Sequence, residues 1–219
     1  MHFMAKNLYK REIYLILAFP LVFFTLQLLL KIDYKYYFTS AWDPAYAFLF
    51  NGLNLADGEL GSGLAGFPGT TVQFFVALMI RLGYLFRNAT ALTEDVLANP
   101  EYYLNIAGYG IILLNSLAIL ISGAILYKHT RDLALSLAIQ LVPFLSITGI
   151  HFNSIVMCEP FLVFAIQGIA LQLALYCHAH KPFSSPGQIC FLSLFVAIGL
   201  TTKMIFIPLF LLPFFMNIG

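Results

Sequence analysis

The chain has 219 residues, of which 61% are hydrophobic and only 10% are charged. Soluble domains carry about 25% charged residues, so this chain is too poor in charge to cover a surface that faces water. Its net charge of +1 comes without a basic patch, which excludes binding to nucleic acid of the usual electrostatic kind. The composition predicts an integral membrane protein.

The first apolar block covers residues 13–30 and follows Lys6, Lys10 and Arg11. A helix needs about 20 apolar residues to cross a bilayer core. No small-residue cleavage site follows the block, so we interpret it as an uncleaved first span and not as a signal peptide. The basic residues before it place the N-terminus in the cytoplasm by the positive-inside rule.

Residues 31–103 form a long mixed segment with seven acidic and four basic side chains. We expect this acidic segment to be an external loop, because it follows a span that runs from inside to outside. Part of it, residues 43–57, is predicted to form a helix in the membrane interface. Its apolar stripe at helical spacing consists of Tyr46, Leu49, Phe50 and Leu53.

Residues 71–86 allow two topologies, because this block is apolar but short and contains Arg81. If it crosses the membrane, the basic turns at residues 128–131 and 178–181 lie outside. If it lies in the interface, both turns lie in the cytoplasm, as the positive-inside rule favours. We therefore predict a second juxtamembrane helix over residues 71–86.

The remaining apolar blocks complete an all-α fold. Residues 188–217 are too long for one span and are interrupted by Lys203, so two short helices are expected to meet there. The whole is predicted to be one transmembrane domain, a multi-pass bundle of about six membrane helices with two juxtamembrane helices in the first external loop. The further predicted spans are residues 104–127, 133–150 and 161–177.

Three ionisable residues fall on the external side in this topology: Asp43, Glu159 and Lys203. Asp43 and Glu159 each precede a proline, and an acid followed by proline is a favoured helix start. Charged groups near membrane depth are also candidates for function. Lys203 lies in an apolar stretch, so its charge requires an acid, a phosphate or a route to water. Snorkelling of the side chain to the membrane interface would supply the route to water.

Other motifs give weaker evidence of a functional site. Residues 61–66 match GxGxxG, but they join two predicted interfacial helices and do not follow a strand, so we interpret them as a flexible loop. No CxxC pair is present, and no set of metal ligands or catalytic nucleophile is recognisable. His151 adjoins the turn that carries Glu159 and is a weaker site candidate.

Three short motifs lie in the predicted external loop: Asp43-Pro44-Ala45-Tyr46, Asn51-Gly52-Leu53-Asn54 and Phe67-Pro68-Gly69-Thr70-Thr71. They resemble the first external loop of the GT-C membrane glycosyltransferases, and they look closest to bacterial relatives of the protein mannosyltransferases and the lipid A aminoarabinose transferase. A basic turn, an acid like Glu159 and a Gly-Leu-x-x-Lys helix follow in matching order. Pro44 stands where many relatives have a second acid, and Phe67 where many have histidine. No cofactor is therefore certain, and a divalent metal stays open.

The resemblance implies an enzyme of the bacterial inner membrane. It would transfer a sugar from a polyprenyl-phosphate donor to a glycan, lipid or protein acceptor at the external face. Asp43 would be the catalytic base, and Lys203 and Arg81 would stabilise the departing lipid phosphate. The other candidates for substrate binding are Glu159, which would orient the acceptor or Lys203, and Tyr46 and His151.

Two other classes of protein stay open. One is a secondary transporter, in which Glu159 and Lys203 would be a buried ion pair on a substrate or proton path. Such transporters show internal repeats with broken helices, and no repeat is recognisable here. The other is a non-catalytic membrane scaffold. Because GT-C enzymes are far longer and the sequence stops inside an apolar stretch, we expect an N-terminal fragment.

Overall fold

The computed structural model describes residues 2–33, 45–59, 69–87, 91–179, 186–203 and 206–210. All regular secondary structure in these ranges is helical, which confirms the predicted all-α class for this part of the chain. Three of the described helices are long and apolar enough to cross a membrane, judged by length and composition. They comprise Arg11–Ile32, Pro100–Thr130 and Glu159–His178.

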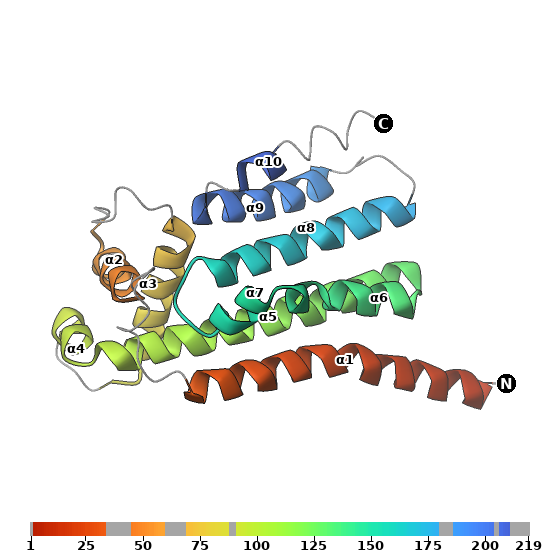
Figure 1. Ribbon diagram of the computed structural model, residues 1–219, viewed down its shortest axis with the longest axis horizontal. Helices are drawn as coiled ribbons and strands as arrows, with labels where there is room; N and C mark the ends of the chain where they lie inside the picture. Colours follow the sequence, from red (N-terminus) through yellow and green to blue (C-terminus); the bar gives the residue numbers. More distant parts are fainter. Residues whose placement is uncertain are drawn as a thin grey trace.

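Four helices lie side by side along the length of the molecule, each packed against the next (Figure 1). The last of them ends one residue before Lys203, near which two helices were expected to meet, and the short helix α10 (Ile207–Phe210) follows. In packing order the four are α1 (His2–Asp33), α5 (Pro100–Thr130), α8 (Glu159–Ala179) and α9 (Pro186–Thr202).

Two sequence features shape this row of helices. Pro20 lies inside α1 and donates no backbone hydrogen bond, which allows the helix to curve as Figure 1 shows. Gly168 lets α9 approach α8 closely, because a Cβ at this position would come within 2.3 Å of the Phe195 ring. A larger residue at position 168 would require the Phe195 ring or the two helices to shift.

The predicted span over residues 133–150 is not a single helix. Three short helices occupy this stretch, and Pro143 lies in the first turn of the second. Proline lacks the N–H group of a continuing helix and clashes with the carbonyl four residues earlier. Ser146 then starts a new helix, because its hydroxyl accepts a hydrogen bond from Gly149 N at 3.0 Å. The three helices are α6 (Leu133–Gln140), η2 (Val142–Leu145) and α7 (Ile147–Phe152).

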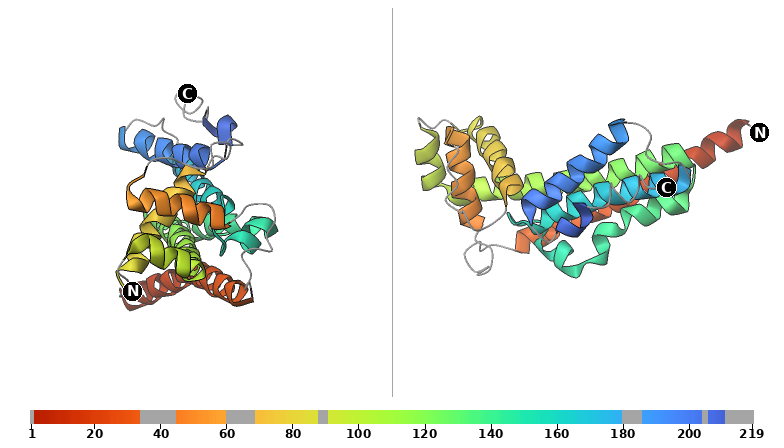
Figure 2. Two further views of the ribbon diagram at one scale, coloured as in Figure 1. Left: turned by 90° about the vertical axis from the view of Figure 1, so that its left-hand side faces the viewer. Right: turned by 90° about the horizontal axis from the view of Figure 1, so that it is seen from above.

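A cluster of three shorter helices lies at one end of the row (Figures 1 and 2). Two of them lie where the sequence predicted juxtamembrane helices, although their bounds differ slightly. Their apolar faces form one core with the first half of α5 and with Val156, Cys158 and Phe161. The three are α2 (Ala45–Asp57), α3 (Thr70–Tyr84) and α4 (Leu92–Ala98).

The buried face of α2 differs from the predicted stripe. Phe48 and Leu49 are fully buried and Asn51 is buried, whereas Phe50 is 39% exposed. The predicted stripe assumed that one apolar face lies on a flat membrane surface, but α2 packs against α3. The contact is close at Gly52, where a Cβ would come within 2.6 Å of the Val76 side chain.

The opposite end of the row contains the start of α1 and the C-terminal ends of α5 and α8 (Figure 1). The Tyr127 hydroxyl near the end of α5 donates a hydrogen bond to the Glu12 carboxylate near the start of α1. The basic turn at residues 128–131 therefore lies at the same end of the molecule as the start of α1. This is the relative placement that the interfacial assignment of residues 71–86 requires.

Candidate functional site

Glu159 and Lys203 form an ion pair between the start of α8 and the end of α9. The Lys203 ammonium donates a hydrogen bond to Glu159 Oε1. The Lys203 side chain is 37% exposed and the Glu159 side chain is 23% exposed. Lys203 is held in place by its backbone, because its N–H donates to the Gly199 carbonyl at 2.9 Å. The pair joins two of the polar residues that the sequence singled out, although 44 positions separate them.

The local sequence explains the position of Glu159. It opens α8 and is followed by Pro160, whose missing N–H is tolerated in the first turn of a helix. The positive end of the helix dipole also favours a carboxylate there. Before it, residues 153–158 form a buried stretch without regular helix, which connects α7 to α8.

This stretch presents polar atoms that no partner satisfies among the described residues: Asn153 Nδ2, Ser154 Oγ and Glu159 Oε2. Asn153 and Ser154 are buried almost completely. The other side of the Asn153 amide is occupied, because Asn115 Nδ2 donates to Asn153 Oδ1 at 2.9 Å. Buried polar groups nearly always have a partner in the protein, in water or in a ligand. These three atoms therefore lack a partner within the part of the chain that the structure describes.

Lys31 is a second cation at this site, although its place in the sequence indicated only one base of the predicted external loop. It is 5% exposed, at the end of α1, and its ammonium lies 3.4 Å from the Ser154 carbonyl oxygen. The ammonium also lies 5.2 Å from the centre of the Tyr109 ring. Gly108 makes room for it, since a Cβ there would come within 2.6 Å of Lys31 Nζ. The sequence signal that could have identified Lys31 as a site residue is its position directly after an apolar block.

Helix α3 reaches the same region through its first turn. The hydroxyl oxygens of Thr71 and Thr201 lie 2.6 Å apart, which ties α3 to the last turn of α9. Thr201 lies two residues before Lys203. The ion pair is therefore located where the long helices meet the cluster of α2, α3 and α4.

Arg81 does not share this location. It lies ten residues after Thr71 on α3, or about 15 Å along the helix axis. Its guanidinium donates to the Ala56 carbonyl at the end of α2. That contact satisfies one of the carbonyl groups that a helix leaves open at its C-terminus, and it gives Arg81 a structural role in joining α2 to α3.

The remaining candidates lie in different places. Tyr46 is half-buried in the first turn of α2, and the pKa of its hydroxyl is raised by burial and, to a smaller extent, by the charge of Glu101. His151 is exposed on α7, with its ring against that of Phe152. Asp43, the predicted catalytic base, lies outside the described residues. Within the described ranges, no three His, Cys, Asp or Glu side chains are grouped so as to hold a metal ion.

A second charged cluster, around Asp95, is fully satisfied and structural. Arg87 binds the Asp95 carboxylate through two nitrogens, at 2.7 and 3.1 Å, and Tyr103 and Asn99 donate to it as well. The hydrogen bonds from Arg87, followed by those from Tyr103, lower the pKa of Asp95 to about 2. A carboxylate with all its oxygens occupied has no capacity for a substrate, and this one fastens α4 to α5.

Comparisons with protein-family models, with curated proteins and with solved structures give no match to this chain.

Proposed function

We propose that this chain is a multi-pass membrane protein whose α2–α4 cluster faces the external side and whose N-terminus faces the cytoplasm. The proposal is supported by the three long apolar helices and by the placement of the basic turn at residues 128–131 beside the start of α1. The end of the molecule that carries the α2–α4 cluster is the more acidic one, since Glu94 and Glu101 are exposed there.

Cysteine labelling in intact cells tests this orientation on a background in which Cys158, Cys177 and Cys190 are replaced by Ala. A membrane-impermeant maleimide is expected to label Glu94→Cys, which is exposed on α4, and to leave His129→Cys unlabelled until the cells are opened. External labelling at position 129 would reverse the proposed orientation.

We further propose that the protein transfers a sugar from a polyprenyl-phosphate donor to a hydroxyl acceptor at that external end. The observation that carries this proposal is the ion pair of Lys203 and Glu159, in which Glu159 Oε2 has no partner among the described residues. The ammonium suits a phosphate, and the carboxylate suits a hydroxyl group of a sugar or its acceptor. The resemblance to GT-C glycosyltransferases supplies the reaction class.

In this mechanism the acceptor hydroxyl attacks the anomeric carbon as its proton passes to Asp43. The bond between that carbon and the phosphate oxygen breaks through an oxocarbenium-like state, and polyprenyl phosphate leaves. Lys203 stabilises the negative charge that develops on the phosphate. Glu159 holds the ammonium in position, so that it need not reorganise during the reaction.

A secondary transporter could also use the ion pair of Glu159 and Lys203. In that case the pair would have to lie on a path that crosses the protein. The pair instead joins the first residue of α8 to the residue after α9, at the end of both helices, and both side chains are partly exposed. A site at the end of the bundle suits a reaction at a membrane face better than a crossing path.

The proposal is tested by incubating membranes that carry the protein with a panel of radiolabelled polyprenyl-phosphate sugars. Transfer of label to an acceptor is expected, and Glu159→Gln should lower it by about tenfold to a hundredfold, because small misplacements of a binding group have effects of this size. Glu94→Gln, which changes an exposed acid at the same end, is the matched control. Uptake of a solute into vesicles without any transfer of label would favour the transporter.

A further inference from the structure

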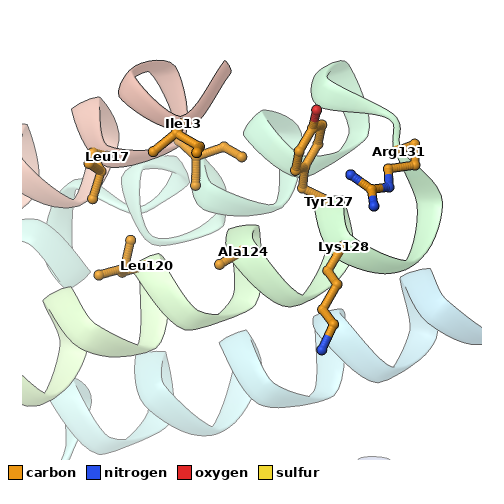
Figure 3. Close-up of a pocket in the computed structure, with 8 residues that line it drawn as sticks. Ile13, Leu17, Leu120, Ala124, Tyr127, Lys128 and Arg131 are labelled. Carbon is orange, nitrogen blue, oxygen red and sulfur yellow. The ribbon is translucent and has the colours of Figure 1, made fainter. Parts of the chain in front are cut away.

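A groove lies between α1 and α5 at the end of the molecule opposite to the Glu159–Lys203 pair (Figure 3). It has a volume of about 580 Å³, which is within the usual range for ligand pockets. Two bases and a tyrosine lie at one end of an otherwise apolar lining (Figure 3). The lining residues are Ile13, Ile16 and Leu17 of α1, Leu120, Ala124, Tyr127 and Lys128 of α5, and Arg131.

We propose that this groove binds one anionic phospholipid, with its phosphate at Arg131 and Lys128 and an acyl chain along the apolar wall. From Lys128 back to Leu120 the groove extends over eight residues of α5, or about 12 Å. An occupant must therefore combine an anion with a long apolar chain. The inference is independent of the glycosyl-transfer proposal.

The charges at the groove end support an anionic head group. Arg131 follows α5 with a left-handed backbone (φ 56°), and its guanidinium lies 6.0 Å from the centre of the Tyr127 ring. Lys128 is exposed, and its ammonium points away from α1 in Figure 3, at the end of a flexible stem that can turn toward the groove. Neither base forms an ion pair within the part of the chain that the structure describes.

Two acids, Glu12 and Asp132, adjoin the same end, and Asp132 directly follows Arg131 and accepts a hydrogen bond from Leu135 N at 3.0 Å. Glu12 accepts the hydrogen bond from the Tyr127 hydroxyl, so part of its charge is already engaged. Arg11, exposed beside it on α1, adds a third base that does not line the groove. Three bases, two of which line the groove, against two acids that already accept hydrogen bonds leave this end positive. In the proposed orientation this end also faces the cytoplasmic leaflet, where anionic lipids are enriched.

Binding is tested with purified protein in detergent, using native mass spectrometry and two lipids with the same acyl chains, phosphatidylglycerol and phosphatidylcholine. Phosphatidylglycerol is expected to bind at least tenfold more tightly. Arg131→Gln should weaken its binding about fivefold, and Arg131→Gln with Lys128→Gln about thirtyfold, since each base near an anionic surface contributes about 1 kcal/mol. Arg11→Gln is the matched control and should have little effect.

Ala124→Phe tests the apolar part without changing any charge. Ala124 is exposed, so the ring fills the groove and does not enter the core. This variant should weaken binding of phosphatidylglycerol and leave any binding of glycerol phosphate unchanged. Equal binding of the two lipids by the native protein would overturn the proposal. So would an Arg11→Gln effect as large as that of Arg131→Gln, because diffuse attraction would then explain the preference. Unaltered lipid binding by Ala124→Phe would exclude the acyl groove.

Discussion

Replacing Asp43 with Asn is expected to lower sugar transfer by about a hundredfold to ten-thousandfold, which is the usual contribution of a general base. Asn keeps the shape of the side chain and an oxygen that can accept hydrogen bonds. It cannot accept the acceptor's proton near neutral pH. The loss should therefore appear in the rate of transfer and not in the amount of protein in the membrane.

The same substitution separates catalysis from helix capping. Asp43 directly precedes Pro44, so it is also the expected cap of α2, and Asn caps a helix about as well as Asp. Asp43→Ala should lose both functions, with an additional decrease of about 1 kcal/mol in stability. Transfer rates and thermal unfolding of the purified variants distinguish the two effects.

Asp57→Asn is a suitable control for Asp43→Asn. Asp57 ends α2, is exposed, and accepts a hydrogen bond from the Thr93 hydroxyl at 3.0 Å. Asn at this position can still accept that bond, so transfer should stay near the native rate. Near-native transfer by Asp43→Asn would exclude Asp43 as the base and make Glu159 the leading candidate.

Replacing Lys203 with Met is expected to lower transfer by about a hundredfold to a thousandfold, as for the loss of one group that stabilises developing negative charge. Met keeps the apolar stem of the side chain and removes the ammonium. Lys203→Arg keeps the charge but changes its shape, so it should retain part of the activity. Turnover and donor affinity measured for both variants give the comparison, and equal values for the two would show that the charge is not used.

Lys203→Met also leaves the Glu159 carboxylate without its partner, which could disturb the site by itself. A double variant, Lys203→Met with Glu159→Gln, removes both charges and controls for this effect. We expect the double variant to fold as well as the native protein and still to lack transfer. If removing both charges restores transfer, Lys203 serves only to neutralise Glu159 and has no direct role with the phosphate.

Local sequence signals predicted much of the helical framework. Proline after an acid marks the start of α8 at Glu159, and Lys203 marks the place where α9 has ended. Such signals act within a few residues, because capping and helix termination depend on neighbouring backbone groups. Pro143 is a signal of the same kind, because it marks a break between short helices within the predicted span over residues 133–150.

Tertiary packing decided which faces are buried and which side chains meet. The predicted stripe on α2 failed at Phe50 because α3 covers a different face of that helix. The sequence indicated only that Lys31 is a base in a loop. The structure places its ammonium against Gly108 and the Ser154 carbonyl. A hydrophobic pattern reports how apolar a helix face is and not which distant segment covers it.

The sequence by itself therefore determined the all-α class, through its shortage of charge and its long apolar blocks. It also identified Glu159 and Lys203 as polar residues that require a partner. Only the tertiary structure decided that each is the other's partner, that Arg81 belongs to a different contact, and that a groove with a basic end lies between α1 and α5. The physical reason is that composition and helix signals act locally along the chain, whereas these contacts form between helices that are distant in sequence.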